Sequence, residues 1–285
     1  MRLFFDSGAT KCDCILLDET GCYVRHFTAR GINANYADDA TIGEVLAEFA
    51  REIDEPCQGI VFSGAGCGNS QNGNRVKMLL HKYFQVENII VESDLAGGCR
   101  LLSPGKAGMV AILGTGAAAC LYDGVRIVQQ VPSLGWMLGD EGSGTYLGKM
   151  FISSYLRGEL SPRTITEFET GHSLERAGVL RKVYREAAPN LFFSNLAKFI
   201  HAHAASDSQV EHIIFTAFDD FFCKQISEIS DYQKYPLHLM GSIAWHFRAE
   251  IENIAHNYGV EMGQVVASPL ELLIREKSEK REKRE

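Results

Sequence analysis

Short apolar runs alternate with polar turns along the first hundred residues, and their spacing predicts a layered α/β arrangement. Three apolar runs joined by tight turns come first, which is the pattern of an antiparallel meander, and later runs alternate with helical periodicity. Strands are expected at 2–5, 11–17, 22–28, 59–63 and 88–92. Helices are expected at 41–53, 73–84 and 94–102. Because strands that alternate with helices pair in parallel, the later strands should extend the meander as parallel strands.

The same layout begins again just past residue 105, after the breaker sequence Ser103-Pro104-Gly105. Strands are expected at 109–113, 117–121, 125–131, 237–240 and 265–267. Helices are expected at 143–157, 189–205, 208–229, 244–258 and from 269 onward. No strict sequence repeat accompanies this recurrence of hairpin strands followed by helices. We therefore expect two α/β domains, an N-terminal one over 1–105 and a C-terminal one over 106–285 that carries helical additions.

Composition narrows the class of protein. Hydrophobic residues make up 46% of the 285 residues and charged residues 22%, which suits a globular chain long enough for two domains. The formal net charge of -8 argues against a nucleic-acid partner, because binding a phosphate backbone needs a basic surface. The sequence has no run of about 18 apolar residues that would predict a membrane span, and Asp6 interrupts the first apolar run, which argues against a secretory signal. The eight cysteines form no CxxC pair, so we expect a cytoplasmic protein in a reducing compartment.

Three glycine-containing turns directly follow predicted strands. They are Asp6-Ser7-Gly8-Ala9-Thr10-Lys11, Gly114-Thr115-Gly116 and Gly241-Ser242-Ile243-Ala244. Glycine lets a backbone approach a phosphate closely and direct its N–H groups toward it, while threonine adds a hydroxyl donor. Asp6 leaves a strand beside the first turn, where a carboxylate could hold Mg2+ through water. Hairpin geometry alone also explains a single turn of this kind, but two similar turns that each open one half of the chain favour phosphate binding.

Two other nucleotide-binding motifs fit less well. The GxxxxGK[ST] loop is absent from the sequence. Residues 114–119 match the GxGxxA letters of the dinucleotide fingerprint, but that fingerprint must open a helix. Here 120–124 reads as the end of a strand followed by a turn, so the sequence disfavours a dinucleotide-binding oxidoreductase.

Together with Gly135-Trp136-Met137-Leu138-Gly139-Asp140-Glu141-Gly142-Ser143, the three turns resemble the motifs of the BadF/BadG-type ATPase family. Within that family the chain is most similar to N-acetylglucosamine kinases and glucosamine kinases, and the motifs follow in family order up to Ser268-Pro269-Leu270. The resemblance implies two ribonuclease-H-like domains of the actin and hexokinase type, with ATP and sugar in the cleft between them. It also implies ATP-dependent, Mg2+-assisted phosphorylation of a small amino sugar by a homodimer, with N-acetylglucosamine as the expected acceptor.

The resemblance places the phosphates of ATP at the first two turns and the adenosine near the third. The expected ATP-binding residues are Gly8, Thr10, Lys11, Gly114, Thr115, Gly116, Gly241 and Ser242. A sugar hydroxyl is a poor nucleophile near neutral pH, so phosphoryl transfer needs a base beside it. Asp94 matches the family's catalytic aspartate, and it stands where a strand ends and a helix begins. A helix N-cap is the alternative role for an aspartate at this position.

Four residues are expected to contact the sugar. They are Asn35, Ser63, Asp94 itself and Asp140. The Asn35 amide offers both a donor and an acceptor to neighbouring hydroxyls, and the nearby Asn33 could take the same role. Asp140 is expected to bind sugar hydroxyls as its family counterpart does, while Glu141 supports either Mg2+ or the loop. Helix-capping carboxylates before Ser143 are the alternative for this pair.

The chain departs from the family pattern at three places. The first turn reads DSGAT rather than DGGGT, and Ala117 stands where a serine often follows the second turn. Leu134-Gly135-Trp136 replaces the usual Trp-Gly order, in the region near the sugar's amide substituent. The sequence therefore leaves N-acetylglucosamine, glucosamine, N-acetylmuramic acid and other hexoses open as acceptors.

Two other functions share the implied fold. A dehydratase activator of this family would hold an iron–sulfur cluster through cysteines at a dimer interface, and Cys120 and Cys223 are available. Their surroundings are not of the activator type. A non-catalytic sugar sensor would carry a DNA-binding segment, which the sequence does not show, and Asp6 and Asp94 are both intact. The sequence therefore favours a kinase over both.

Overall fold

In the computed structural model, which describes residues 1–53 and 56–282, the chain packs as two compact units. The first unit contains Met1–Lys106, Asp123–Ile127 and the chain from Ser268 onward, and the second contains Ala107–Tyr122 and Val128–Ala267. The expected second domain, 106–285, therefore differs from the structure at 123–127 and at its last helix, both of which belong to the first unit. The helix takes that place because Leu270 and Leu273 are buried against Ile15 and Leu17 of the first sheet.

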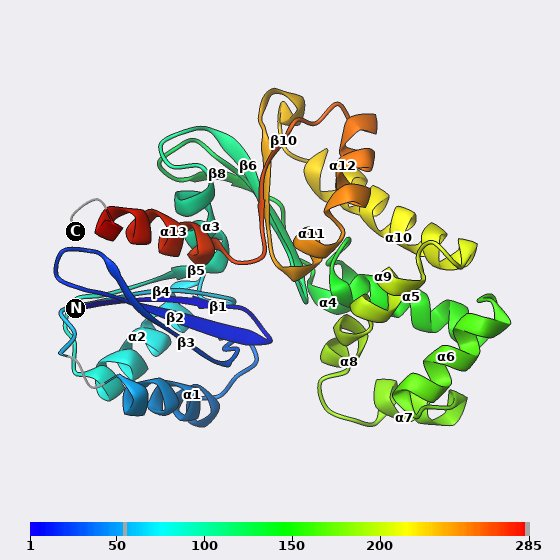
Figure 1. Cartoon of the computed structure of the whole chain (residues 1–285), viewed down its shortest axis with the longest axis horizontal. Coiled ribbons are helices and arrows are strands. Elements are labelled where there is room, and N and C mark those ends of the chain that lie inside the picture. Colours follow the sequence, from blue (N-terminus) through cyan, green and yellow to red (C-terminus); the bar gives the residue numbers. More distant parts are fainter. Residues whose placement is uncertain (54–55, 283–285) are drawn as a thin grey trace. The chain divides into compact units, whose positions relative to one another are not determined.

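A five-stranded sheet forms the centre of the first unit, with helices on both faces (Figure 1). Its strands are β1 (Arg2–Ser7), β2 (Lys11–Leu17), β3 (Tyr23–Arg30), β4 (Gly59–Gly64) and β5 (Ile89–Ser93). Its helices are α1 (Asp39–Glu52), α2 (Ser70–Phe84), α3 (Asp94–Leu102) and α13 (Pro269–Glu282). The strand order is β3-β2-β1-β4-β5, in which β1 pairs antiparallel with β2 and parallel with β4. The predicted meander followed by parallel strands is confirmed.

The two faces of this sheet bury different side chains, because successive strand residues point to opposite faces. Leu3 and Phe5 lie in the core beneath α1 and α2, where the Phe5 ring packs edge-on against Phe49 at 5.2 Å between centroids. Ile15 and Leu17 face the other way, toward α13. Fully burying one such side chain contributes about 1.5–3 kcal/mol to the free energy of folding. These buried side chains therefore stabilise the packing of helices on both faces of the sheet.

The second unit contains a sheet with the same strand arrangement. Its strands are β6 (Gly108–Leu113), β7 (Ala117–Tyr122), β8 (Ile127–Gln130), β9 (Leu237–Met240) and β10 (Met262–Val266). The order β8-β7-β6-β9-β10 repeats that of the first sheet strand for strand, with β6 antiparallel to β7 and parallel to β9. The layout expected to recur does so as a repeated strand order, without a repeated sequence.

Helices between β8 and β9 form the helical additions of the second unit (Figure 1). They are α4 (Gly135–Leu138), α5 (Gly144–Arg157), α6 (Pro162–His172), α7 (Arg176–Tyr184), α8 (Pro189–Asn195), α9 (Ala197–His203), α10 (Ser208–Phe221), a π-helical turn (Phe222–Ile226) and a 3-10 turn (Tyr232–Lys234). Two more helices, α11 (Ser242–His246) and α12 (Arg248–Asn257), lie between β9 and β10. Among the described residues no helix is long and apolar enough to cross a membrane.

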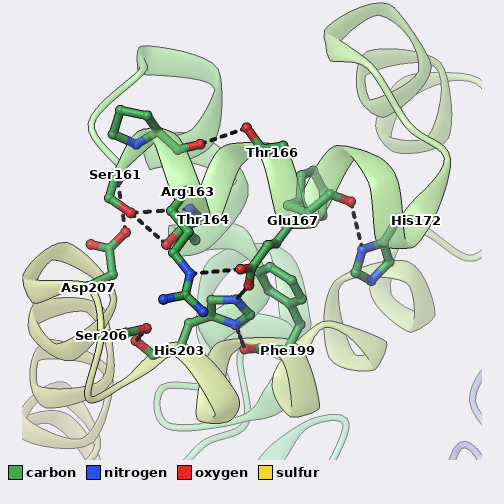
Figure 2. A network of polar contacts seen from close by, with 12 residues as sticks. Ser161, Arg163, Thr164, Thr166, Glu167, His172, Phe199, His203, Ser206 and Asp207 are labelled. Carbon is green, nitrogen blue, oxygen red and sulfur yellow. Dashed lines mark hydrogen bonds and ion pairs between the residues drawn. The ribbon is translucent and has the colours of Figure 1, made fainter.

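Polar contacts fasten α6 to α9 and to the start of α10 (Figure 2). The Asp207 carboxylate caps α10 by accepting from the Gln209 N–H at 2.9 Å, and it also accepts from the Ser161 N–H at 2.8 Å. The His203 Nε2 lies 2.7 Å from the Glu167 carboxylate, which joins α9 to α6. One buried aspartate thus ties the beginnings of two helices together.

Asp207→Ala should lower the free energy of unfolding by about 2 kcal/mol, because it removes a helix cap and leaves the Ser161 N–H without its acceptor. Asp207 is only 5% exposed, so water does not readily replace the carboxylate. Thermal unfolding followed by circular dichroism measures the effect. The control is Ser206→Ala, since Ser206 is exposed and donates to the His203 carbonyl at a long 3.3 Å. Equal melting temperatures for the two variants would contradict the capping role.

Candidate functional site

The carboxyl ends of β1, β4 and β5 bring three expected site residues to one edge of the first sheet. Asp6 pairs with Ser63 across β1 and β4, and Ser63 pairs with Glu92 across β4 and β5. Asp94 follows directly after β5 and begins α3. Paired residues of neighbouring strands point to the same face, so Asp6 and Ser63 share one face of the sheet. The edge where parallel strands end is the usual place for ligands in α/β folds.

Asp94 keeps its carboxylate available because another residue caps the helix. Ser93 is the N-cap of α3, and its hydroxyl accepts from the Ala96 N–H at 3.1 Å. The Asp94 Oδ1 accepts from the adjacent Leu95 N–H at 2.9 Å. Burial raises the pKa of Asp94 to about 6, although the Leu95 hydrogen bond works against the shift. A carboxylate with a pKa near the operating pH suits general-base catalysis.

Asp6 lies close enough to Asp94 for the two charges to interact. Burial, and then the charge of Asp94, raise the pKa of Asp6 to about 7. The Ser268 Oγ, just before α13, donates to the Asp6 Oδ2 at 3.2 Å and opposes this shift. A divalent cation would offset the repulsion between the two carboxylates, so these residues fit Mg2+. Within 1–53 and 56–282 no three His, Cys, Asp or Glu side chains gather as a metal cage, and Mg2+ commonly uses one or two carboxylates with water and substrate phosphates.

The turn between β1 and β2 is shaped by a close backbone contact. The Gly8 N–H donates to the Lys11 carbonyl at 3.0 Å, and the Gly31 N–H donates to the Thr10 carbonyl at 3.0 Å. A Cβ at Gly31 would lie 2.4 Å from the Gly8 carbonyl oxygen, so glycine is needed for the chain to pass here. Gly8, Thr10 and Lys11 are themselves exposed, where a phosphate could reach them.

Asp13 is a buried carboxylate beside this turn that the sequence pattern did not assign to the site. It is 6% exposed, and its Oδ1 accepts from the His26 Nε2 at 2.8 Å and the Thr28 Oγ1 at 2.8 Å. The Lys11 Nζ pairs with the same oxygen at 2.9 Å. Asp13 therefore holds Lys11 next to the turn. The signal in the sequence is an aspartate in the middle of an otherwise apolar strand, since aspartate is rarely buried unless paired.

Asn33 and Asn35 take different roles in the loop after β3. The Asn33 Oδ1 accepts from the Asn35 N–H at 3.0 Å, and the Asn33 carbonyl accepts from the Tyr36 N–H at 3.0 Å. Asn33 therefore shapes the turn. The Asn35 side chain is exposed, and its Oδ1 accepts from the Asn72 Nδ2 at 2.9 Å. This geometry favours Asn35 over Asn33 as a ligand contact, because Asn35 presents its amide outward.

Ser63 is more enclosed than a typical ligand contact. It is 8% exposed, and its Oγ donates to the Glu92 Oε1 at 2.8 Å. Glu92 in turn forms an ion pair with Arg100. A Cβ at Gly97 would lie 2.3 Å from the Ser63 Oγ, so α3 packs directly on the hydroxyl. Because the proton is directed to Glu92, Ser63 could offer a sugar only its oxygen lone pairs.

In the second unit, the start of α5 is fixed on the turn between β6 and β7. The Gly114 carbonyl accepts from the Gly144 N–H at 2.8 Å. The Thr115 carbonyl accepts from the Thr145 N–H at 3.2 Å and from its hydroxyl at 2.6 Å. A Cβ at Gly116 would lie 2.8 Å from the Asp140 Oδ2. The structure thus brings the second turn and Asp140, which are separate motifs in the sequence, into direct contact.

Gly241 places the third turn against the same strand end. Its φ is +116°, and a Cβ there would lie 2.4 Å from the Leu113 carbonyl oxygen and 3.3 Å from the Gly114 nitrogen. Ser242 begins the short helix α11 immediately afterward and is exposed. The two turns of the second unit therefore share one edge of its sheet.

Asp140 and Glu141 line a pocket of about 170 Å³ in the second unit. Burial raises the pKa of Asp140. Ser143, rather than either carboxylate, is the side-chain N-cap of α5. Gln225 donates from its Nε2 to the Glu141 Oε2 at 3.1 Å, and Lys224 lines the same pocket. Both come from the π-helical turn, which the sequence pattern predicted as ordinary helix, so their place in the pocket could not be foreseen.

The chain is similar to a known protein family and to solved structures over most of its length. The model of the BadF/BadG/BcrA/BcrD ATPase family matches residues 5–260. A candidate N-acetylglucosamine kinase from Porphyromonas gingivalis is 31% identical with a TM-score of 0.87, and the match covers 99% of this chain and 100% of that one.

Two more distant structures show the fold. A candidate N-acetylglucosamine kinase from Chromobacterium violaceum is 15% identical with a TM-score of 0.76, over 97% of this chain and 98% of that one. A ROK family glucokinase from Streptomyces griseus, solved with glucose and AMPPNP, is 13% identical with a TM-score of 0.56, over 98% of both chains. A search of curated proteins found no match.

Proposed function

Because the chain belongs to the BadF/BadG/BcrA/BcrD ATPase family, we propose that it is an ATP-dependent kinase that phosphorylates a small amino sugar. The observation that carries the proposal is the Asp94 carboxylate, whose pKa is raised and whose helix is capped by Ser93 instead. It stands near Asp6, at the strand edge that also carries the first glycine turn. Similarity to the candidate N-acetylglucosamine kinase supports N-acetylglucosamine as the first acceptor to test.

In the proposed mechanism Asp94 accepts the proton of a sugar hydroxyl as that oxygen attacks the γ-phosphorus of ATP. The bond from the γ-phosphorus to the bridging oxygen breaks, so the products are a sugar phosphate and ADP. Asn35 would bind a neighbouring hydroxyl and hold the attacking oxygen in line, which removes much of the entropic cost of the encounter. On the resemblance, Asp140 is proposed as a further sugar contact. Ser63 would accept a further hydrogen bond from the sugar.

The proposed ATP contacts come from residues of the three glycine turns. Mg2+, when bound, neutralises charge on the β- and γ-phosphates. Asp6 would hold it through water, because Mg2+ gives up its water reluctantly. Thr10 and Lys11 would supply donors to phosphate oxygens, and the backbone of 114–116 would do the same from the second unit. Gly241 and Ser242 would lie at the adenosine.

Gly114→Ala separates phosphate binding from folding. A Cβ at Gly114 would meet no atom within 4 Å, so the melting temperature should not change. If phosphates lie against this turn, the added methyl excludes them, and KM for ATP should rise about tenfold or more. Steady-state kinetics with ATP and sugar varied in turn measures this, with KM for the sugar as the internal control. An unchanged KM for ATP would contradict phosphate binding at the second turn.

The two alternative functions find less support. An interface iron–sulfur cluster needs thiolates at the surface, and Cys120 is fully buried within β7 while Cys223 is exposed on the π-helical turn. A sensor would not need a base with a pKa tuned toward neutrality, as Asp94 has.

The proposal also includes a cytoplasmic homodimer, on the resemblance to related kinases. Sedimentation equilibrium of the purified chain tests the dimer.

The experiment that tests the kinase proposal is ADP release from Mg-ATP in the presence of single sugars. N-acetylglucosamine, glucosamine, N-acetylmuramic acid and glucose form the panel, and the reaction without sugar gives the background ATP hydrolysis. Turnover well above background with one amino sugar is expected and identifies the acceptor. Equal rates with and without every sugar would contradict the kinase proposal.

A further inference from the structure

Asn72 contacts the proposed sugar-binding residue Asn35 from the first turn of α2. The Asn72 backbone N–H donates to the Oδ1 of the N-cap Asn69 at 2.8 Å, so capping is carried out by Asn69. The Asn72 side chain lies toward the loop after β3, where its Nδ2 meets the Asn35 Oδ1 at 2.9 Å. The Asn72 side-chain amide therefore does not cap the helix and can form other hydrogen bonds.

The orientation of both amides is fixed by one backbone carbonyl. The Asn72 Nδ2 donates to the Gly66 carbonyl at 3.0 Å, and a carbonyl oxygen can only accept. Turning the Asn72 amide over would set its oxygen against the Gly66 oxygen. The atom of Asn35 that faces the Asn72 Nδ2 must therefore be the acceptor, Oδ1. Asn35 thus points its oxygen toward α2 and its NH2 group away from it.

The backbone position of Asn35 is set by contacts that do not involve Asn72. The Ala34 N–H donates to the Ala65 carbonyl at 2.9 Å, which joins the loops after β3 and β4 by their backbones. Gly66 has φ +79°, and a Cβ there would lie 2.7 Å from the Asn35 backbone nitrogen. These backbone contacts place the Asn35 Cα, while the contact with Asn72 sets which end of the amide faces outward.

We propose that Asn72 is a positioning residue that makes Asn35 a hydrogen-bond donor toward the sugar. A free asparagine side chain offers a donor and an acceptor in either order. With its oxygen directed to Asn72, Asn35 presents two N–H donors. The part of the sugar that meets Asn35 therefore supplies oxygen lone pairs, as a hydroxyl or an amide carbonyl does. This inference rests on the proposed function, because it concerns a sugar contact of that reaction.

Asn72→Asp is the sharpest variant, because it keeps the shape of the side chain and removes the donor. The introduced carboxylate repels the oxygens of Gly66 and Asn35, so Asn35 should turn its NH2 group inward and its oxygen toward the sugar. KM for the sugar should then rise about tenfold or more, since a site built to donate loses its donor. KM for ATP should stay within about twofold. Asn74→Ala, an exposed position of the same helix, is the matched control and should behave as wild type.

A double-mutant cycle separates positioning from a general structural effect. In the Asn35→Ala background, Asn72→Asp should cause no further rise in KM for the sugar, because the residue it acts through is gone. The ligand-free protein gives a second readout. The side-chain NH2 resonances of Asn35, identified by their loss in Asn35→Ala, should shift in Asn72→Asp and remain in place in Asn74→Ala.

The outcomes distinguish this inference from the proposed function. Wild-type protein that turns over no sugar overturns the proposed function, and the inference about a sugar contact with it. Active wild-type protein with an unchanged sugar KM in Asn72→Asp overturns the inference alone. The inference is equally overturned if Asn72→Asp still raises the sugar KM after Asn35 has been replaced.

Discussion

Asp94→Asn should reduce kcat for sugar phosphorylation by about 10²–10⁴-fold, the usual contribution of a general base. The asparagine amide cannot accept the hydroxyl proton, although its oxygen can still accept from the Leu95 N–H as the Asp94 Oδ1 does at 2.9 Å. The fold of α3 should therefore persist, and KM for ATP should stay within about twofold. Steady-state kinetics on both enzymes measures the effect. A variant with near wild-type kcat would remove Asp94 from the mechanism.

The same residue should set the acid side of the pH profile. Burial raises the pKa of Asp94 to about 6, and the base acts in its ionised form. At saturating Mg-ATP, which favours the ionised form of Asp6, wild-type kcat should therefore hold above that pH and fall as the pH decreases through it. The residual activity of Asp94→Asn should lack this step. The same acid limb in the variant would show that another group titrates.

Asp94→Asn should also stabilise the protein near neutral pH. The pKa of Asp94 is raised on folding, so the protonated form is favoured in the folded state and stability is lost as the pH rises through about 6. At about pH 8 Asp94 is ionised in the wild type, and its partly buried charge carries a desolvation cost that the neutral amide does not. A higher melting temperature for the variant at that pH is expected. A lower one would contradict the burial of this charge.

Gly241→Ala should strongly damage the second unit, because it combines an unfavourable backbone conformation with a backbone clash. Its φ of +116° and ψ of 161° form a combination that side chains other than glycine rarely adopt, which costs about 1–3 kcal/mol. The new Cβ would lie 2.4 Å from the Leu113 carbonyl oxygen and 2.8 Å from the Leu113 carbonyl carbon. These are backbone atoms of β6, so relief requires the strand end itself to move. We expect a melting temperature lowered by several degrees and an ATP KM raised about tenfold or more.

Gly171→Ala provides the control for this prediction. Gly171 lies in α6, where a Cβ would meet no atom within 4 Å, and alanine is a better helix former by about 1 kcal/mol. Its melting temperature should equal or exceed that of wild type, with an unchanged KM for ATP. Wild-type stability in Gly241→Ala would mean that the close approach of the third turn to β6 does not hold in solution.

Strand positions were predictable because short apolar runs between turn residues form few structures other than buried strands. The two sheets contain strands at all the expected places, in the order that a meander followed by parallel strands implies. The position of α13 was not predictable. Leu270 and Leu273 form an apolar face that could cover either sheet, and only the tertiary structure shows that it packs on Ile15 and Leu17.

The helical additions were the least predictable part. No element was expected between 158 and 188, yet α6 and α7 lie there. The pair Ser161-Pro162 is an N-cap followed by proline at the first helical position, which does signal a helix start. In α7 only Val179 is buried, so the apolar periodicity was too weak to detect. The expected helix over 189–205 is divided into α8 and α9, which follow one another at Leu196.

Motif residues of the site could be predicted, but their supporting residues could not. Asp94 stands in a recognisable motif, whereas its freedom from capping depends on Ser93 accepting from Ala96. Asp13 and Asn72 lie inside a strand and a helix, where polar residues are usually taken to face solvent. Their roles depend on partners far away in the sequence, which periodicity cannot identify.

Phosphorus NMR of Mg-ATP and N-acetylglucosamine, incubated with wild-type protein and with Asp94→Asn, tests the proposed kinase reaction most directly. A sugar phosphomonoester signal should grow with wild type as the ATP signals decline, and no such signal should grow with the variant. ATP converted only to inorganic phosphate, or a sugar phosphate formed equally by both proteins, would contradict it.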